Sequence, residues 1–300
     1  MKHYFRIADF TICLDFVDGQ PNDLSLVSSL YPFLLSADAM SADVSLLFTM
    51  TIDDTCSVVP RERRHRIRTF DTGNGDTVVD KLDDGGYQFI IKDLRKEECA
   101  LLVADKDFSH CHCALNGTRS MRTFGFTNAL MLSFAYASSY YGTLLMHASL
   151  VRHEGRAYAF TAKSGTGKST HVSLWMQHIA NCDIMNDDNP IIRIMDDGVC
   201  VYGGPWSGKT PCYRNVKAPL GAVVRIDRAP ENSIEKQNAI EAFISVLPSC
   251  ASMKWDEDLW DRVCTNVTKL VEQVPCYILH CLPDEEAAMI CHNAIHKSEK

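Results

Sequence analysis

The strongest structural signal in this chain is the run Ala162-Lys163-Ser164-Gly165-Thr166-Gly167-Lys168-Ser169-Thr170. Residues 156–161 before it read as a buried strand, and residues 170–178 after it have helical spacing. A strand, a small-residue loop, Gly-Lys-Ser and a helix follow one another in this order in a phosphate-binding P-loop. The usual pattern begins with Gly, whereas this one begins with Ala162, which a backbone of negative φ accommodates.

A loop of this kind binds phosphate for a physical reason. Its backbone N–H groups turn inward as an anion nest, and the following helix adds the positive end of its dipole. We expect Lys168 to reach the β- and γ-phosphates and Ser169 to place its hydroxyl on Mg²⁺. The predicted nucleotide-binding residues are Ser164, Gly165, Thr166, Gly167, Lys168, Ser169 and Thr170.

The composition limits the class of protein. The chain of 300 residues is long enough for two domains, and its 46% of hydrophobic residues can fill a sizeable core. Its net charge of −8 and its pI near 5.7 argue against a nucleic-acid partner, which a basic surface would bind. No apolar stretch is long enough to span a bilayer, and the 13 cysteines follow no secretion signal. We therefore expect a cytoplasmic protein with reduced thiols and no membrane partner.

Two domains are expected from the pattern of elements. Residues 1–124 alternate strand-like runs with Gly- and Asp-rich turns, which predicts a smaller β-rich N-terminal domain. Residues 125–300 carry the P-loop and predict a nucleotide-binding, kinase-like α/β domain. The basic run of the first domain, residues 60–68, reads as a solvated strand or loop face, with a docking patch for an acidic partner as the alternative.

The second domain is expected to contain a mixed sheet. A strand over residues 143–151 and a turn at 153–156 form a hairpin with the strand that leads into the P-loop. After the P-loop helix, a short strand ends in Asp187-Asp188. The remaining pattern predicts a hairpin over 191–202, strands over 220–226 and 275–280, and helices over 128–136, 233–247, 256–272 and 284–295.

The acidic pair supplies candidate catalytic groups. A carboxylate at a strand end beside a P-loop can hold Mg²⁺, and a neighbouring carboxylate can accept the proton of an attacking hydroxyl. We assign Asp187 as the base or orienting group, and Asp188 together with Ser169 as the metal ligands. The alternative is a solvated turn before Asn189-Pro190.

Three further residues are candidates for the same site. His147 lies on the strand antiparallel to the P-loop strand, where it is either a core histidine or a phosphate or metal contact. Lys209 and Arg214 follow a Gly- and Pro-rich loop, and they are either a mobile clamp on the γ-phosphate or ordinary exposed side chains. With Asp187 and Lys168, these three residues complete the predicted catalytic set.

The residues around the P-loop resemble a known group. His147-Ala-Ser-Leu-Val151, the P-loop and Asn186-Asp-Asp188 resemble the kinase domain of HPr kinase/phosphorylase and, more distantly, the nucleotide-binding half of phosphoenolpyruvate carboxykinase. The similarity covers roughly residues 140–230. Tyr202-Gly-Gly-Pro-Trp-Ser-Gly-Lys209 and Val274-Pro-Cys-Tyr-Ile-Leu279 resemble the uncharacterised HPr-kinase-like branch found in bacterial peptide-modification loci.

The resemblance implies a P-loop on a mixed sheet and a phosphoryl-transfer reaction. It implies that Lys168 and Ser169 hold the nucleotide phosphates and the metal. It also implies that Asp187 and Asp188 supply base and metal ligand, and that His147 belongs to the site. The chain has no counterpart of the Asn-Leu-Glu-x-Arg-Gly segment of HPr kinases, so the resemblance does not extend to HPr as the substrate.

We therefore predict an ATP- or GTP-dependent kinase that uses Mg²⁺. The expected acceptor is a hydroxyl, either of a peptide or protein serine or of a small molecule. The alternative is a nucleotide-binding regulatory or scaffold protein that transfers no phosphoryl group. HPr kinases are ring-shaped oligomers, which makes a homo-oligomer one further expectation.

Overall fold

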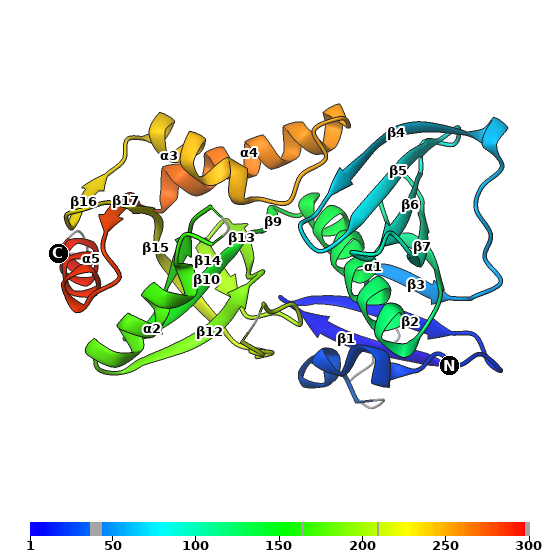
Figure 1. The fold of residues 1–300 in the computed structure, drawn as a ribbon, viewed down its shortest axis with the longest axis horizontal. Helices are drawn as coiled ribbons and strands as arrows, with labels where there is room; N and C mark the ends of the chain where they lie inside the picture. Colours follow the sequence, from blue (N-terminus) through cyan, green and yellow to red (C-terminus); the bar gives the residue numbers. More distant parts are fainter. Residues whose placement is uncertain (37–43, 164, 209, 298–300) are drawn as a thin grey trace. The chain divides into compact units, whose positions relative to one another are not determined.

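The computed structural model describes residues 1–36, 44–163, 165–208 and 210–297. Contacts divide the chain into two compact units, Met1–Ser138 and Ser139–Lys300, and each is built on a mixed sheet (Figure 1). The division falls after Ser138, whereas the sequence suggested residue 124, because helix α1 (Arg119–Ser139) packs on the sheet of the first unit. Two aromatic pairs join the helix to β2 of that sheet, Phe126 with Phe16 and Phe134 with Phe10, and Tyr136 packs on Phe108 in the turn between β7 and β8.

The first unit is organised around an eight-stranded sheet. Its strand order is β1-β2-β3-β8-β7-β6-β5-β4, in which β3 is parallel to β2 and β8 and the other pairs are antiparallel. The β-rich character predicted from alternation is therefore present. The elements are β1 (Lys2–Ile7), β2 (Phe10–Phe16), η1 (Leu24–Phe33), β3 (Leu46–Ile52), η3 (Arg61–Arg63), β4 (Arg64–Asp71), β5 (Asp76–Leu82), β6 (Tyr87–Lys92), β7 (Glu98–Ala104) and β8 (His110–Leu115).

The basic run of this unit is partly structural. Residues 61–63 form η3 and are exposed, but Arg64 and Arg66 on β4 pair with the buried carboxylate of Asp80 on β5. Gln88 Nε2 donates to the same carboxylate at 2.9 Å. Burial alone would raise the pKa of Asp80, but the hydrogen bonds and charges of the two arginines outweigh it and lower that pKa. At least two of these arginines therefore stabilise the sheet, and a docking role for the others stays a prediction.

The second unit carries a nine-stranded sheet. Its main order is β12-β10-β11-β15-β14-β13-β9, and β17 adds to β15 on one side and to β16 on the other. The pairs β11·β15 and β15·β17 are parallel and the rest are antiparallel, so the expected mixed sheet is confirmed. The strands are β9 (Thr143–Leu145), β10 (Ala148–His153), β11 (Arg156–Thr161), β12 (Cys182–Asp188), β13 (Ile191–Met195), β14 (Gly198–Tyr202), β15 (Lys217–Arg228), β16 (Ser233–Lys236) and β17 (Cys276–Cys281).

Helices cover both faces of this sheet. One core cluster contains residues of α3 (Ala239–Val246) and α4 (Glu257–Gln273), and a second contains residues of α2 (Lys168–His178) and α5 (Glu285–Lys297). The unit is therefore a three-layer α/β/α arrangement (Figure 1). Among the described residues, no helix combines the length and apolar character needed to cross a membrane.

Two predicted elements differ from the structure. The strand expected over 143–151 is two strands, because β9 pairs with β13 whereas β10 pairs with β11 and β12, and His147 lies at the break. The helix expected over 233–247 begins only at Ala239. Residues Ser233–Lys236 instead form β16, which pairs with β17, and Asn238 caps α3 in a capping box with Glu241.

Candidate functional site

Two glycines shape the loop between β11 and α2. Gly165 and Gly167 adopt positive φ values of 76° and 129°, at which a side chain would be strained, and Gly167 is the N-cap of α2. The first N–H groups of α2 have no carbonyl partner within the helix, so this end of α2 can receive an anion. Ser164 lies outside the described residues, and its role stays a prediction.

A residue that the sequence did not single out fixes this loop. Arg228, the last residue of β15, donates from Nε to the carbonyl of Thr166 at 3.0 Å and from NH2 to that of Gly165 at 2.7 Å. β15 runs parallel to β11, so both strands end at the same edge of the sheet, which brings Arg228 to the loop. With its carbonyls bound by Arg228, the loop keeps its carbonyl oxygens away from a phosphate.

The acidic pair lies directly beside the P-loop. β12 pairs antiparallel with β10, and the register places Ser149 opposite Asp187. Ser149 Oγ donates to Asp187 Oδ1 at 2.6 Å, and Ser169 Oγ donates to the same carboxylate at 3.2 and 3.4 Å. Asp187 is only 4% exposed. A buried carboxylate and a P-loop hydroxyl are therefore in direct contact, and two oxygen ligands of one hard cation must lie this close together.

The second carboxylate is linked to the P-loop lysine through a histidine. Lys168 Nζ lies 2.8 Å from His147 Nε2, and His147 Nδ1 lies 3.0 Å from Asp188 Oδ1. His147 therefore lies between the lysine and the carboxylate, with its Nδ1–H placed to donate to Asp188. The break between β9 and β10 places His147 there. The structure thus unites Lys168, His147 and Asp188 in one chain of contacts.

The environment changes the proton affinity of two of these groups. Burial lowers the pKa of Lys168, and the charges of Asp188 and Asp187 only partly oppose that effect. Burial would raise the pKa of Asp188, but the hydrogen bond and charge of His147, with the charge of Lys168, outweigh it and lower that pKa. Asp188 is therefore ionised at neutral pH and can accept a hydrogen bond from a hydroxyl.

Asp188 is also held in a strained backbone. Its φ is 115°, which side-chain-bearing residues rarely adopt and which is found mostly at functional sites. Neighbouring groups fix this conformation: the N–H of Gly208 and the hydroxyl of Ser207 both donate to the carbonyl of Asp187, at 2.6 and 3.0 Å, and Asn189 Nδ2 donates to Asp188 Oδ2 at 2.8 Å. The pair is therefore a fixed feature of the strand end and not a solvated turn.

One of the two predicted clamp residues, Arg214, pairs with a different carboxylate. Arg214 donates from NH1 to Asp183 Oδ2 at 2.7 Å, and Arg152 holds the same carboxylate. Asp183 precedes Asp187 on β12 by four residues, or about 13 Å of strand. In this structure Arg214 is an ion-pair partner of Asp183 and makes no contact with the acidic pair. Lys209 lies outside the described residues, and its role stays a prediction.

Two pockets flank the P-loop. One of about 480 Å³ lies beside Gly167 and Thr170 and is lined mostly by apolar side chains, among them Leu174, Ile226 and Pro283. The other, of about 350 Å³, lies beside His147. It is lined by His147, Thr161, Ala162, Lys163, Arg225, Ser245, Pro248 and Ser249. The site therefore has one pocket beside the N-terminus of α2 and another beside His147.

Sequence reasoning missed two residues of this site. Ser149 was quoted within the run that follows His147, but no role was given to it, although a hydroxyl two residues after a site histidine on a strand faces the same side. Arg228 gave no local signal, because its contact with residues 165 and 166 depends on the pairing of β15 with β11.

Comparison with known proteins adds little to this geometry. No family model matches the chain, and no curated protein matches it either. Among solved structures, the chain is similar to the Hpr(Ser) kinase/phosphatase from Coxiella burnetii, with 8% identity over 52% of this chain and 92% of that chain. The TM-score of 0.32 does not establish a shared fold.

Proposed function

We propose that this chain is a nucleotide-dependent phosphotransferase that moves the γ-phosphoryl group of ATP or GTP to a hydroxyl. One observation supports this most strongly. Both side chains of the P-loop that act on phosphate and metal, Lys168 and Ser169, contact the acidic pair, the first through His147 and the second directly. A loop that only binds phosphate does not need two carboxylates arranged in this way.

The phosphates are proposed to lie on the N-terminus of α2. The backbone N–H groups of the loop and the helix dipole favour negative charge there, and Lys168 adds a full positive charge. Gly167 and Thr170 are proposed to contribute N–H groups, and Thr166 and Thr170 hydroxyls, while Arg228 keeps the loop in its binding conformation. The N–H of Thr166 is not counted because it donates to the carbonyl of Lys163 at 3.0 Å. The pocket beside Thr170 and Leu174 is proposed to take the nucleoside, since its lining is mostly apolar.

Ser169 and Asp187 are proposed to hold Mg²⁺. They fit the ion because both offer oxygen, because Asp187 is buried, and because a second hydroxyl, that of Ser149, orients its carboxylate. When bound, the ion neutralises charge on the β- and γ-phosphate oxygens. From the sequence, Asp187 was assigned as the base and Asp188 as the metal ligand. The two roles are exchanged in this proposal because Ser169 contacts Asp187 directly.

Asp188 is then proposed to orient and deprotonate the acceptor hydroxyl. It is ionised, it is partly exposed, and His147 fixes one of its oxygens at 3.0 Å. The pocket beside His147 is proposed to receive the acceptor, because Lys163, Arg225 and Ser249 in its wall can form hydrogen bonds with a peptide serine or a small hydroxylated molecule. Ser164 and Lys209 remain proposed as additional phosphate contacts.

Product formation from ATP tests this proposal. Purified protein with Mg²⁺ and ATP or GTP should release nucleoside diphosphate, slowly to water and faster with a serine-containing peptide or small-molecule acceptor, as followed by phosphorus NMR. Asp188→Asn should keep nucleotide binding and lose roughly 100-fold or more in turnover, because it removes the base. Asp196→Asn, an exposed carboxylate on the β13–β14 turn, is the matched control and should behave as wild type.

Two results would contradict the proposal. Turnover unchanged in Asp188→Asn would remove the base from the mechanism. Mg²⁺-dependent nucleotide binding without turnover on any acceptor would instead favour the regulatory or scaffold alternative.

A further inference from the structure

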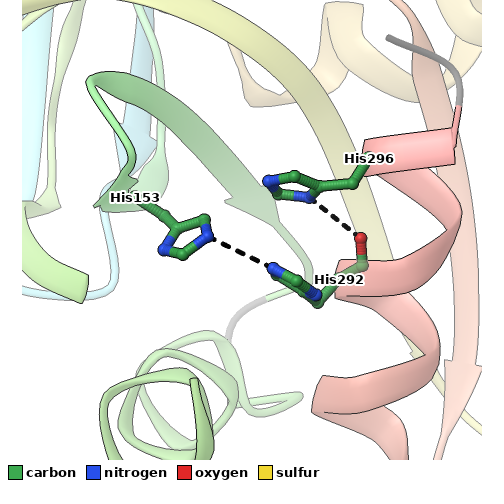
Figure 2. A group of neighbouring side chains, drawn as sticks. All are labelled: His153, His292 and His296. Atoms are coloured by element: carbon green, nitrogen blue, oxygen red, sulfur yellow. Dashed lines mark hydrogen bonds between the residues drawn. The ribbon is translucent and has the colours of Figure 1, made fainter. Parts of the chain in front are cut away.

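Three histidines gather in the second unit, away from the phosphate site. His153 is the last residue of β10, and His292 and His296 lie one turn apart on α5 (Figure 2). One ring nitrogen of each lies within 4.8 Å of those of the other two. His147, at the opposite end of β10, is six residues from His153, or about 20 Å of strand. Neither the phosphate chemistry nor the nucleotide pockets use this cluster.

The spacing of the rings matches a metal site. Nε2 of His153 lies 3.3 Å from Nε2 of His292. Two imidazole nitrogens on one tetrahedral Zn²⁺, each about 2.0–2.1 Å from the ion, are about 3.3 Å apart. Without an ion the same two nitrogens can share a hydrogen bond, which metal binding would replace. The third ligand atom, from His296, lies within 4.8 Å of both.

The helix supplies two ligands with the correct geometry. His292 and His296 are four residues apart, so both side chains project from the same face of α5 toward β10 (Figure 2). His296 Nδ1 lies 3.0 Å from the carbonyl oxygen of His292, to which its N–H can donate. That hydrogen bond places the lone pair on Nε2, as a backbone carbonyl commonly does for a metal-bound histidine. The Tyr158 hydroxyl lies 3.5 Å from this nitrogen and would give way to the ion.

His153 has an unbalanced polar environment. The residue is 6% exposed, and within the described part of the chain its Nδ1 has no hydrogen-bond partner. The nitrogen that faces His292 is Nε2, so Nε2 is the ligand atom that His153 offers. Aromatic packing explains part of the cluster, since the rings of His292 and His296 stack at 4.1 Å and Trp175 lies edge-on to His292. Packing does not explain why the nitrogens of three rings converge.

We propose that His153, His292 and His296 form a binding site for a transition-metal cation, Zn²⁺ being the ion expected. Imidazole nitrogen is a preferred ligand of Zn²⁺, and three such nitrogens leave a fourth position for water or for the carboxylate of Glu154, whose Oε1 lies 3.9 Å from His153 Nε2. The ion joins α5 to β10, two elements that are otherwise held together by packing. Metal binding therefore fastens the C-terminal helix to the sheet.

The experiment uses the full chain after removal of metal with a chelator. Zn²⁺ is titrated in competition with a chromophoric chelator, and Co²⁺ serves as the spectroscopic probe of the ligands. One equivalent should bind, the Co²⁺ spectrum should show nitrogen and oxygen ligation without a thiolate charge-transfer band, and Trp175 fluorescence should be quenched. His292→Gln should weaken binding at least roughly tenfold. His178→Gln, a histidine on α2 outside the cluster, is the matched control and should bind as wild type.

Several results would overturn the site. The proposal fails if no equivalent of Zn²⁺ binds, or if His292→Gln binds Zn²⁺ as tightly as wild type. It also fails if Co²⁺ gives a thiolate charge-transfer band, which would assign the ion to some of the 13 cysteines. If His292→Gln does not fold, X-ray absorption at the zinc edge of the wild-type protein decides. Three imidazole neighbours support the proposal, and a sulfur neighbour or fewer than three imidazoles refutes it.

Discussion

Acid should destabilise the second unit through His171. This residue of α2 is 2% exposed, and its Nε2 accepts a hydrogen bond from Trp175 Nε1 at 3.0 Å. Burial lowers the pKa of His171 from its ordinary value of 6.5 to about 4. The imidazole of His171 therefore takes up a proton at a higher pH in the unfolded chain than in the folded chain. The free energy of unfolding therefore falls as the pH drops from about 6.5 toward about 4.

The size of the effect follows from the two pKa values. The full loss attributable to His171 is about 3 kcal/mol, and about 2 kcal/mol of it appears between pH 7 and pH 5. In His171→Gln the titrating group is absent, while the amide oxygen can still accept the hydrogen bond from Trp175. This variant should therefore lose about 2 kcal/mol less stability than wild type between the two pH values.

Urea unfolding followed by tryptophan fluorescence measures this difference. All four tryptophans, at positions 175, 206, 255 and 260, belong to the second unit, so the signal does not report on the first. His178→Gln, at the end of the same helix, should keep the acid sensitivity of wild type. Equal acid losses in wild type and His171→Gln would refute the reasoning, because the buried imidazole would then not be the group that titrates.

The remaining predictions concern other parts of the chain. Asp80→Ala should destabilise the first unit by about 3 kcal/mol in calorimetry, because it leaves two arginines without their buried partner, whereas Arg61→Ala should change stability by less than about 0.5 kcal/mol. Arg228→Ala should weaken nucleotide binding in calorimetric titration roughly tenfold, because the P-loop carbonyls lose their partner; unchanged affinity would contradict this. Asn238→Ala should lower the free energy of unfolding by about 1 kcal/mol, since it removes the N-cap of α3. Denaturant unfolding measures this loss, and an unchanged free energy of unfolding would contradict the prediction.

Features encoded by neighbouring residues could be predicted from the sequence. The turn at 153–156 and the hairpin of β13 and β14 depend on glycines and small residues a few positions apart, and both appear in the structure. The glycine-rich loop between β11 and α2 was predictable in the same way, and its phosphate-binding role stays a prediction. The strand ending in the acidic pair was predictable for the same reason. Local spacing fixed these elements because their geometry is decided within about ten residues.

Features that depend on distant pairing could not be predicted. Ser233–Lys236 becomes a strand because β17 offers it a partner some forty residues later, and its own sequence is compatible with helix. The roles of Ser149 and Arg228 depend on register between strands. The histidine cluster joins residues 139 positions apart, so no local pattern announces it.

The central claim is that the P-loop binds a nucleotide with Mg²⁺. Thermal unfolding with tryptophan fluorescence tests it directly, with ATP, GTP and pyrophosphate added in the presence and absence of Mg²⁺. At about 100 times its dissociation constant, a nucleotide should stabilise the second unit by about 2.7 kcal/mol. The shift should require Mg²⁺, should be absent in Lys168→Ala, and should persist in Lys269→Ala, an exposed lysine of α4. No shift with any of the three ligands, or an equal shift in Lys168→Ala, would contradict the claim.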